Sequence, residues 1–288
     1  MSEAHGGYYV PHQSHWPIVG SIGLFVLMAG FASLLNGASF GPTLMIAGAV
    51  ITILMMVGWF GTVIRENQQG LYHEREDMSY RWGMGWFIFS EVMFFAAFFG
   101  ALFYARVLVV PWLGGAAPEE WTHRLLWQGF EAAWPTNGPG NVGGEFQPMG
   151  AWGLPAINTL ILLSSGATVT WAHWGIKEGN RQKQIIGLAA TVALGFLFVF
   201  LQAFEYGEAY SHLNLTLESG IYGSTFFMLT GFHGMHVTVG AIMLLVMLGR
   251  AIAGHFTEEN HFAFEAAAWY WHFVDVVWLG LFVFVYWL

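Results

Sequence analysis

Residues 84–110 read MGWFIFSEVMFFAAFFGALFYARVLVV, an apolar run with only two charged side chains, Glu91 and Arg106. A helix rises about 1.5 Å per residue, so about 20 apolar residues cross the roughly 30 Å hydrocarbon core of a bilayer. The run does not alternate between polar and apolar residues, which argues against a transmembrane β-strand. This stretch therefore predicts a transmembrane helix long enough to tilt or to project from the membrane.

Six further stretches share this length and composition, so we predict an all-α integral membrane protein with seven transmembrane helices. The composition of the whole chain agrees, because 56% of its 288 residues are hydrophobic and only 9% are charged, against roughly 25% charged residues in soluble domains. The predicted helices span residues 17–36, 42–64, 84–110, 154–175, 185–207, 222–250 and 266–288.

One polar stretch and one long loop divide the predicted helices. The polar stretch, RENQQGLYHEREDMSYR at 65–81, suggests a hinge between a two-helix hairpin and a five-helix bundle. The loop at 111–153 is rich in Gly, Pro and Trp, and we expect an ordered, non-helical cap or a partner-contacting loop there. The predicted organisation is a tail (1–16), a two-helix hairpin (17–64), a polar connection (65–83) and a five-helix bundle (84–288).

The distribution of Lys and Arg predicts the orientation of the chain. An N-terminus in the cytoplasm satisfies the positive-inside rule, because most basic residues then lie on the inner side and the C-terminus faces out. The first sixteen residues lack Lys and Arg, so they resemble neither a signal peptide nor a transit peptide. The inner residues are Arg65, Arg75, Arg81, Lys177, Arg181, Lys183 and Arg250, and the outer ones are Arg106 and Arg124.

The composition also excludes several kinds of site. Cysteine is absent, which excludes disulfides, thiolate metal sites and cysteine nucleophiles. A metal bound by this chain would need His, Asp, Glu or Met ligands. The net charge of −9 and the scattered basic residues argue against a nucleic-acid partner.

Glu91 is the clearest polar residue within the predicted helices. A charged side chain at the centre of a transmembrane helix costs roughly 2.5 to 3.5 kcal/mol on insertion scales. Glu91 has no charged neighbour within one helical turn on either side. Two interpretations remain open: a carboxylate that faces a cavity, a lipid headgroup or a proton path, and a neutral group hydrogen-bonded to another helix.

Two pairs of polar side chains lie three residues apart, so each pair shares one helix face. His233 and His236 belong to the stretch GFHGMHVTVG, and His272 and Asp275 to the last predicted helix. Such pairs bind ligands or orient one another in functional sites, and they also tie helices together in lipid. We favour the structural role for both pairs, and we group Glu205 with them as a buried polar residue.

Three other classes of membrane protein, namely metal-dependent enzymes, retinal proteins and transporters, would each require particular sequence features. A di-iron enzyme needs Glu-x-x-His turns on facing helices, but the two such spacings, at 120–123 and 258–261, fall in connections on opposite sides of the membrane. A haem or copper site made from His233, His236 and His272 stays geometrically possible. A retinal protein needs a lysine within a helix, and a transporter is expected to show matching halves; neither feature is evident.

Several stretches closely resemble subunit III of the haem–copper cytochrome c oxidases: WAHWGIKEG at 171–179, LQAFEYGEA at 201–209, GSTFFMLTGFHGMHVTVG at 223–240 and above all FEAAAWYWHFVDVVWL at 264–279. The resemblance is strong from Arg81 to Leu288. It implies a seven-helix subunit without a catalytic residue or redox centre of its own. Haem and copper would belong to partner subunits I and II, with subunit I as the main contact.

The resemblance further implies a V-shaped, phospholipid-holding cleft between the hairpin and the bundle, with Trp59, Phe87, Glu91 and Arg250 as lipid-binding residues. Arg offers phosphate a fork of donors, and Trp suits the headgroup boundary. The subunit would support proton uptake and protect the catalytic subunit. His5, His12 and His15, which titrate near neutrality, would help to collect protons.

The complex implied by the resemblance passes electrons from cytochrome c to O2 and pumps protons. A related quinol oxidase is the alternative, because the electron-donor site lies in subunit II. We expect a bacterial inner membrane, with a cytoplasmic N-terminus and a periplasmic C-terminus; a mitochondrially encoded subunit would share the same start. Two departures from the family pattern are Trp174, where a second histidine is usual, and the loop LYHERED at 71–77.

Overall fold

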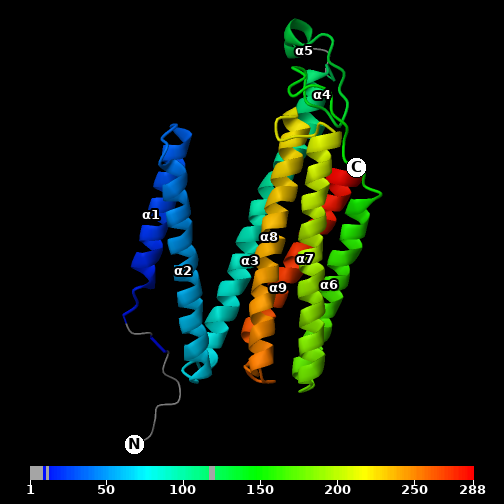
Figure 1. Ribbon diagram of the computed structural model, residues 1–288. Helices are drawn as coiled ribbons and strands as arrows, with labels where there is room; N and C mark the ends of the chain where they lie inside the picture. The colour runs from blue at the N-terminus through cyan, green and yellow to red at the C-terminus, as the bar shows by residue number, and fades with distance from the viewer. Residues whose placement is uncertain (1–8, 11–12, 117–120) are drawn as a thin grey trace, which may run out of the picture. The chain divides into compact units, whose positions relative to one another are not determined.

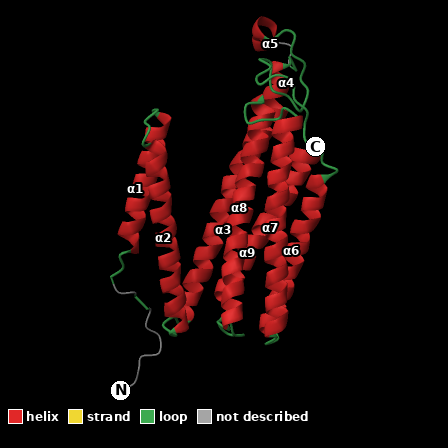
Figure 2. Ribbon diagram, in the orientation of Figure 1, coloured by secondary structure: helices red, strands yellow, loops and turns green. Residues whose placement is uncertain are grey.

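The structure is a computed structural model of the chain and describes residues 9–10, 13–116 and 121–288. These residues form helices and loops, without a β-strand (Figures 1 and 2). Seven helices are long and apolar enough to cross a membrane, which confirms the predicted fold class. The helices are α1 (Trp16–Leu35), α2 (Gly41–Gln68), α3 (Glu74–Phe103), the π-helix η1 (Tyr104–Val109), α4 (Val110–Leu113), α5 (Trp121–Leu126), α6 (Leu154–Lys177), α7 (Arg181–His212), α8 (Gly220–Ala253), α9 (Phe262–Leu281) and the π-helix η2 (Phe282–Trp287).

The chain divides into two compact units, Met1–Trp82 and Gly83–Leu288. The first contains the hairpin of α1 and α2, in which glycines let the two backbones approach closely. A Cβ atom added to Gly30 would lie 2.4 Å from the Met45 backbone nitrogen, and one added to Gly48 would lie 2.3 Å from that of Leu27. Such contacts matter in lipid because helices there associate through van der Waals packing.

The core of the second unit is a bundle in which α6 and α8 each pack on both α7 and α9 (Figure 1). Two tryptophans of α9 are completely buried at its centre. The indole nitrogen of Trp271 donates to Ser165 Oγ at 2.8 Å, and that of Trp278 donates to Thr159 Oγ1 at 2.9 Å. Both hydrogen bonds tie α9 to α6, so the register of these two helices is set by polar contacts within an apolar core.

Helix α3 packs on α8 and α9 through aromatic side chains. Phe95 is 2% exposed, and its ring lies 4.9 Å from that of His236 on α8. The Phe94 ring meets Phe232 at 5.0 Å, nearly at a right angle. Edge-to-face contacts of this kind are favourable beyond the apolar area they bury.

The long loop between α4 and α6 packs against the ends of α7 and α8. The Gln147 backbone nitrogen donates to the Leu213 carbonyl at 2.9 Å, and Asn214 Nδ2 donates to the Glu145 carbonyl at 2.8 Å. Phe146 stacks on Tyr222 with ring centroids 5.4 Å apart. The described part of the loop therefore packs as a cap on these helix ends. The expectation that the cap is non-helical is wrong, because α4 and α5 are short helices in this region.

Several helices extend beyond their predicted bounds. Helix α2 continues to Gln68 instead of ending at residue 64, and α3 begins at Glu74 instead of residue 84. Most of the predicted polar connection at 65–83 is therefore helical. Hydropathy marks the part of a helix that suits hydrocarbon, whereas the backbone hydrogen bonds continue where the side chains become polar.

We predict that Gly48→Ala destabilises the hairpin of α1 and α2, by about 1–3 kcal/mol, because the added methyl group overpacks a backbone contact. The measurement is the unfolding temperature of the purified protein in mild detergent, followed by circular dichroism. The matched control is Gly61→Ala on the same helix, where an added Cβ meets nothing within 4 Å. Equal unfolding temperatures for the two variants would contradict the close packing of the hairpin.

Candidate functional site

Glu91 on α3 forms a hydrogen bond with His236 on α8. Glu91 Oε2 lies 2.9 Å from His236 Nε2. The other ring nitrogen, His236 Nδ1, lies 2.6 Å from the backbone carbonyl of Phe232. Residues 145 positions apart in the sequence thus form one polar contact inside an aromatic environment.

The position of the protons in this pair follows from its partners. A carbonyl oxygen only accepts, so His236 Nδ1 carries a proton and donates it. One further proton is then shared between Nε2 and the Glu91 carboxyl group. Whether the pair is neutral or an ion pair, its net charge is zero, which lowers the cost of placing it at membrane depth.

His233 is directed toward a different helix from His236. It is fully buried, and its Nε2 donates to the Val274 carbonyl of α9 at 3.2 Å. Its ring contacts both Phe198 and Trp278, with centroid distances of 5.6 and 5.0 Å. The two histidines of GFHGMHVTVG therefore have separate protein partners and do not converge on one ligand.

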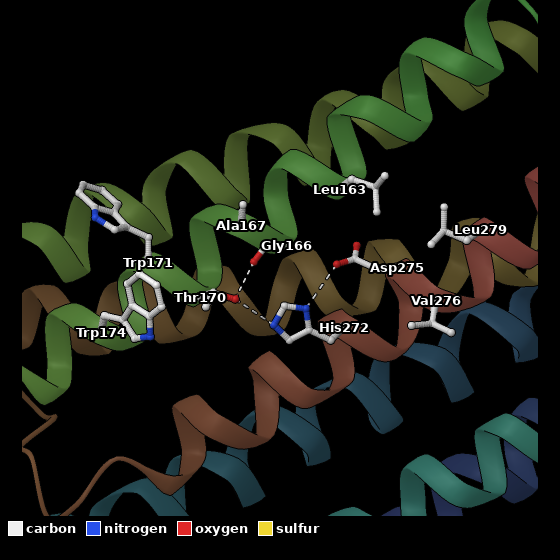
Figure 3. A pocket seen from close by; sticks show the side chains of 10 residues that line it. All are labelled: Leu163, Gly166, Ala167, Thr170, Trp171, Trp174, His272, Asp275, Val276 and Leu279. Atoms are coloured by element: carbon white, nitrogen blue, oxygen red, sulfur yellow. Dashed lines mark hydrogen bonds and ion pairs between the residues drawn. The ribbon is translucent and has the colours of Figure 1, made fainter.

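His272 and Asp275 lie in an open groove between α6 and α9 of about 550 Å³ (Figure 3). His272 Nδ1 lies 3.5 Å from Asp275 Oδ2, and His272 Nε2 lies 3.3 Å from Thr170 Oγ1. Figure 3 shows Trp171 and Trp174 at one end of the groove. The imidazole is thus held between α6 and α9 while about half of it, 46%, stays exposed.

Asp275 is nearly buried, and it approaches the backbone of α6 closely. A Cβ atom added to Gly166 would lie 2.4 Å from Asp275 Oδ2. The second carboxylate oxygen, Oδ1, is buried without a hydrogen-bond partner. The carboxylate thus occupies a notch that only glycine leaves open.

Glu205 on α7 is completely buried and accepts a hydrogen bond from Tyr286 Oη on η2 at 2.6 Å. Its other oxygen, Oε2, has no partner. The contact connects the C-terminal third of α7 to η2. The structural role predicted for these buried polar residues stays a prediction, although each now has a defined neighbour.

The predicted lipid-binding residues differ in exposure. Trp59 and Phe87 are each about half exposed, whereas Arg250 near the end of α8 is only 8% exposed. The Arg250 guanidinium lies 4.7 Å from the centre of the Phe256 ring, and its Nε is buried without a hydrogen-bond partner. Arg250 follows His236 by fourteen residues on α8, a rise of about 21 Å. It therefore lies far from the Glu91–His236 pair.

The predicted proton-collecting histidines lie at the start of the chain. His15 precedes α1, is exposed and packs against Trp16 with ring centroids 4.2 Å apart. His5 and His12 lie outside the described residues.

A different group of side chains has the spacing of metal ligands. Among the described residues, this group consists of His173, His261 and Glu265. None of the histidines considered for a haem or copper site belongs to it. The group could not be recognised in the sequence because His173 lies on α6, whereas the other two residues lie at the start of α9, nearly ninety residues later.

Comparison with known proteins identifies the family. Residues 6–288 match the family Cytochrome c oxidase subunit III. The chain belongs to this family. It is 43% identical over 286 residues to the cytochrome c oxidase subunit 3 of Carassius auratus and to that of Cyprinus carpio, and 42% identical to that of Gadus morhua. Each alignment covers 99% of this chain and 98% of the relative.

Membership of the subunit III family has direct consequences. The chain is a subunit of a cytochrome c oxidase complex, so it has partner subunits. It is also a multi-pass membrane protein, with seven long apolar helices among the residues that the structure describes. The prediction that this chain has no redox metal centre of its own is consistent with this family.

We predict that subunit III depends on the hydrogen bond between Glu91 and His236. Glu91→Leu leaves His236 Nε2 without a partner, which costs about 1–3 kcal/mol. Glu91→Gln keeps an N–H donor for the neutral imidazole and is expected to be tolerated better. The measurement is the fraction of subunit III that stays with the oxidase on heating in detergent. Equal losses for the Gln and Leu variants would show that the hydrogen bond is unimportant.

Proposed function

We propose that this chain is the subunit III of a proton-pumping oxidase that uses cytochrome c, and that it holds phospholipid against the complex without taking part in electron transfer. In this role it supports proton uptake and protects the catalytic subunit. Its main partner would be subunit I, with subunit II in the same complex. The relatives are subunits of cytochrome c oxidases, which favours cytochrome c over quinol as the electron donor.

The environment of Arg250 is the main support for the lipid proposal. The guanidinium is largely covered, and no carboxylate among the described residues forms an ion pair with it. Removing a charge from water without a counterion is costly. A phosphate group from lipid would supply that counterion, since Arg binds phosphate through its fork of donors.

The positions of the other predicted residues suit the chains of such a lipid. Arg250 lies near the end of α8 at which basic residues are predicted to face the cytoplasm. Phe87 lies one turn before Glu91 on α3 and is about half exposed. A headgroup at Arg250 would therefore place acyl chains along the aromatic side chains of α3. Trp59, which is about half exposed on α2, is proposed as a further lipid-binding residue.

The test of the lipid proposal is Arg250→Gln in the intact oxidase. We expect the complex to lose tightly bound phospholipid, measured as lipid phosphorus and by native mass spectrometry, and to inactivate sooner during turnover. Arg75→Gln is the control, because Arg75 is an exposed arginine predicted to lie on the same side of the membrane. Unchanged lipid content in the Arg250 variant would overturn the proposal.

The proposed support of proton uptake rests on the histidines before α1. His15 is exposed to solvent, and histidine exchanges protons near neutral pH. The proposal places the oxidase in a bacterial inner membrane with these residues in the cytoplasm, where protons are taken up. The bacterial membrane is part of the proposal, because the relatives named above come from fish.

We predict that replacing His5, His12 and His15 together by Gln lowers turnover mainly above about pH 7, where free protons are scarce and a histidine can still buffer. Turnover at pH 6 should change little. The measurement is the steady-state rate of oxygen consumption against pH. A profile that matches the wild-type oxidase throughout would remove the proton-collecting role while leaving the lipid proposal intact.

A further inference from the structure

The segment before α1 is attached to the hairpin at two points, and the first is Trp16. Figure 1 shows the start of α1 beside α2, toward the end at which α2 leads into α3. Here Trp16 Nε1 donates to Thr62 Oγ1 on α2 at 3.2 Å. A Cβ atom added to Gly58, one turn earlier on α2, would collide with the Trp16 ring. The indole therefore lies in a gap on α2 that glycine leaves open.

The second attachment point is Glu76 near the beginning of α3. This residue is almost completely buried, with 3% of its surface exposed. One carboxylate oxygen accepts from the Tyr9 backbone nitrogen, and the other accepts from the His73 backbone nitrogen at 2.8 Å. Hydrogen bonds from backbone N–H groups to a carboxylate are roughly twice as strong as those between neutral groups. Glu76 thus joins the segment before α1 to the turn between α2 and α3.

The Tyr9 side chain adds to this attachment. Its hydroxyl group donates to Glu66 Oε1 at 3.3 Å, and the Tyr72 hydroxyl donates to the other oxygen of Glu66 at 2.6 Å. The rings of Tyr9 and Tyr72 meet edge to face, with centroids 5.9 Å apart. Tyr9 is therefore held through its backbone and its side chain by two carboxylates of the Met1–Trp82 unit.

The two attachment points enclose two of the histidines near the start of the chain. In the sequence, His12 and His15 lie between Tyr9 and Trp16. A residue between two fixed points of a chain cannot move farther from either point than about 3.5 Å for each intervening residue. With Tyr9 detached, only the limit set by Trp16 would remain. The Glu76 attachment therefore raises the effective concentration of imidazole at this end of the hairpin.

We propose that Glu76 is a positioning residue for proton uptake, because it holds the segment before α1 where its histidines can collect protons. The inference rests on the proton-collecting role proposed above and deepens it. Glu76 transfers no proton in this role, since both of its oxygens accept from backbone N–H groups. It acts through the histidines.

Several titratable side chains surround this attachment. Those that face Tyr9 and Glu76 are Glu66, Tyr72, Tyr80 and His73. Histidine is the residue type among them that titrates between pH 6 and 8. His73 is therefore left unchanged in every variant of the test, so that a change in the pH profile does not come from its imidazole.

The test compares Glu76→Ala with Glu74→Gln in the intact oxidase. In Glu76→Ala, the peptide that contains Tyr9 and Val10 should take up deuterium about tenfold faster or more, the factor expected when a hydrogen bond to a charged group is lost. Turnover should fall at pH 8 and stay near the wild-type value at pH 6. Glu74 is an exposed carboxylate on the same helix, so Glu74→Gln should match the wild type in both measurements.

The deciding measurement adds Glu76→Ala to the variant in which His5, His12 and His15 are replaced. If Glu76 acts through these histidines, the added substitution lowers turnover no further. A further loss at every pH would reveal a general structural role and overturn the proposal. Wild-type turnover in Glu76→Ala despite faster deuterium uptake would also overturn it.

The same data separate this inference from the role on which it rests. Wild-type turnover in the histidine variant by itself would remove the proton-collecting role, whereas a loss there without a loss in Glu76→Ala would remove only the positioning role. If Glu76→Ala oxidase does not assemble, Tyr9→Pro replaces it in every comparison. Proline lacks the N–H group that Glu76 accepts, and α3 then keeps its own sequence.

Discussion

Hydrocarbon offers polar side chains no hydrogen-bond partner, so a polar group at membrane depth has to find its partner on another helix. In the Gly83–Leu288 unit, α9 and η2 supply hydrogen-bond partners for polar groups on the neighbouring helices. Trp271 and Trp278 donate to α6, and Tyr286 donates to Glu205 on α7. The Val274 carbonyl accepts from His233 on α8. These contacts make the last helix the element on which the registers of α6, α7 and α8 depend.

The same constraint explains the shape of the helix surfaces around α9. Gly195 and Gly240 leave room for the Trp271 ring, because a Cβ atom at either position would lie within 3.0 Å of it. Asp275 enters the notch at Gly166 in the same way. Large polar or aromatic side chains thus lie opposite glycines on the facing helix, which lets the helices pack closely in lipid.

The seven transmembrane helices could be predicted from the sequence because burial in lipid is a property of each segment alone. The bounds were less accurate. Glu74 and Gln68 lie in helices although their surroundings are polar, since helix ends are set by backbone hydrogen bonds and not by hydropathy. The pairing of Glu91 with His236 was not predicted either. Glu91 was recognised as a residue that needs a partner, but that partner lies 145 residues away.

The fold class could be predicted from the amino-acid sequence alone, and the resemblance to known subunits indicated the family to which the chain belongs. It also showed that His233 and His236 share one region of one helix, since three residues span most of a turn. The packing of the helices was needed to show that His236 faces α3 while His233 faces α9. It likewise brought His173 next to His261 and Glu265. The physical reason is that hydropathy and helical period are local, whereas partner choice depends on how distant helices pack.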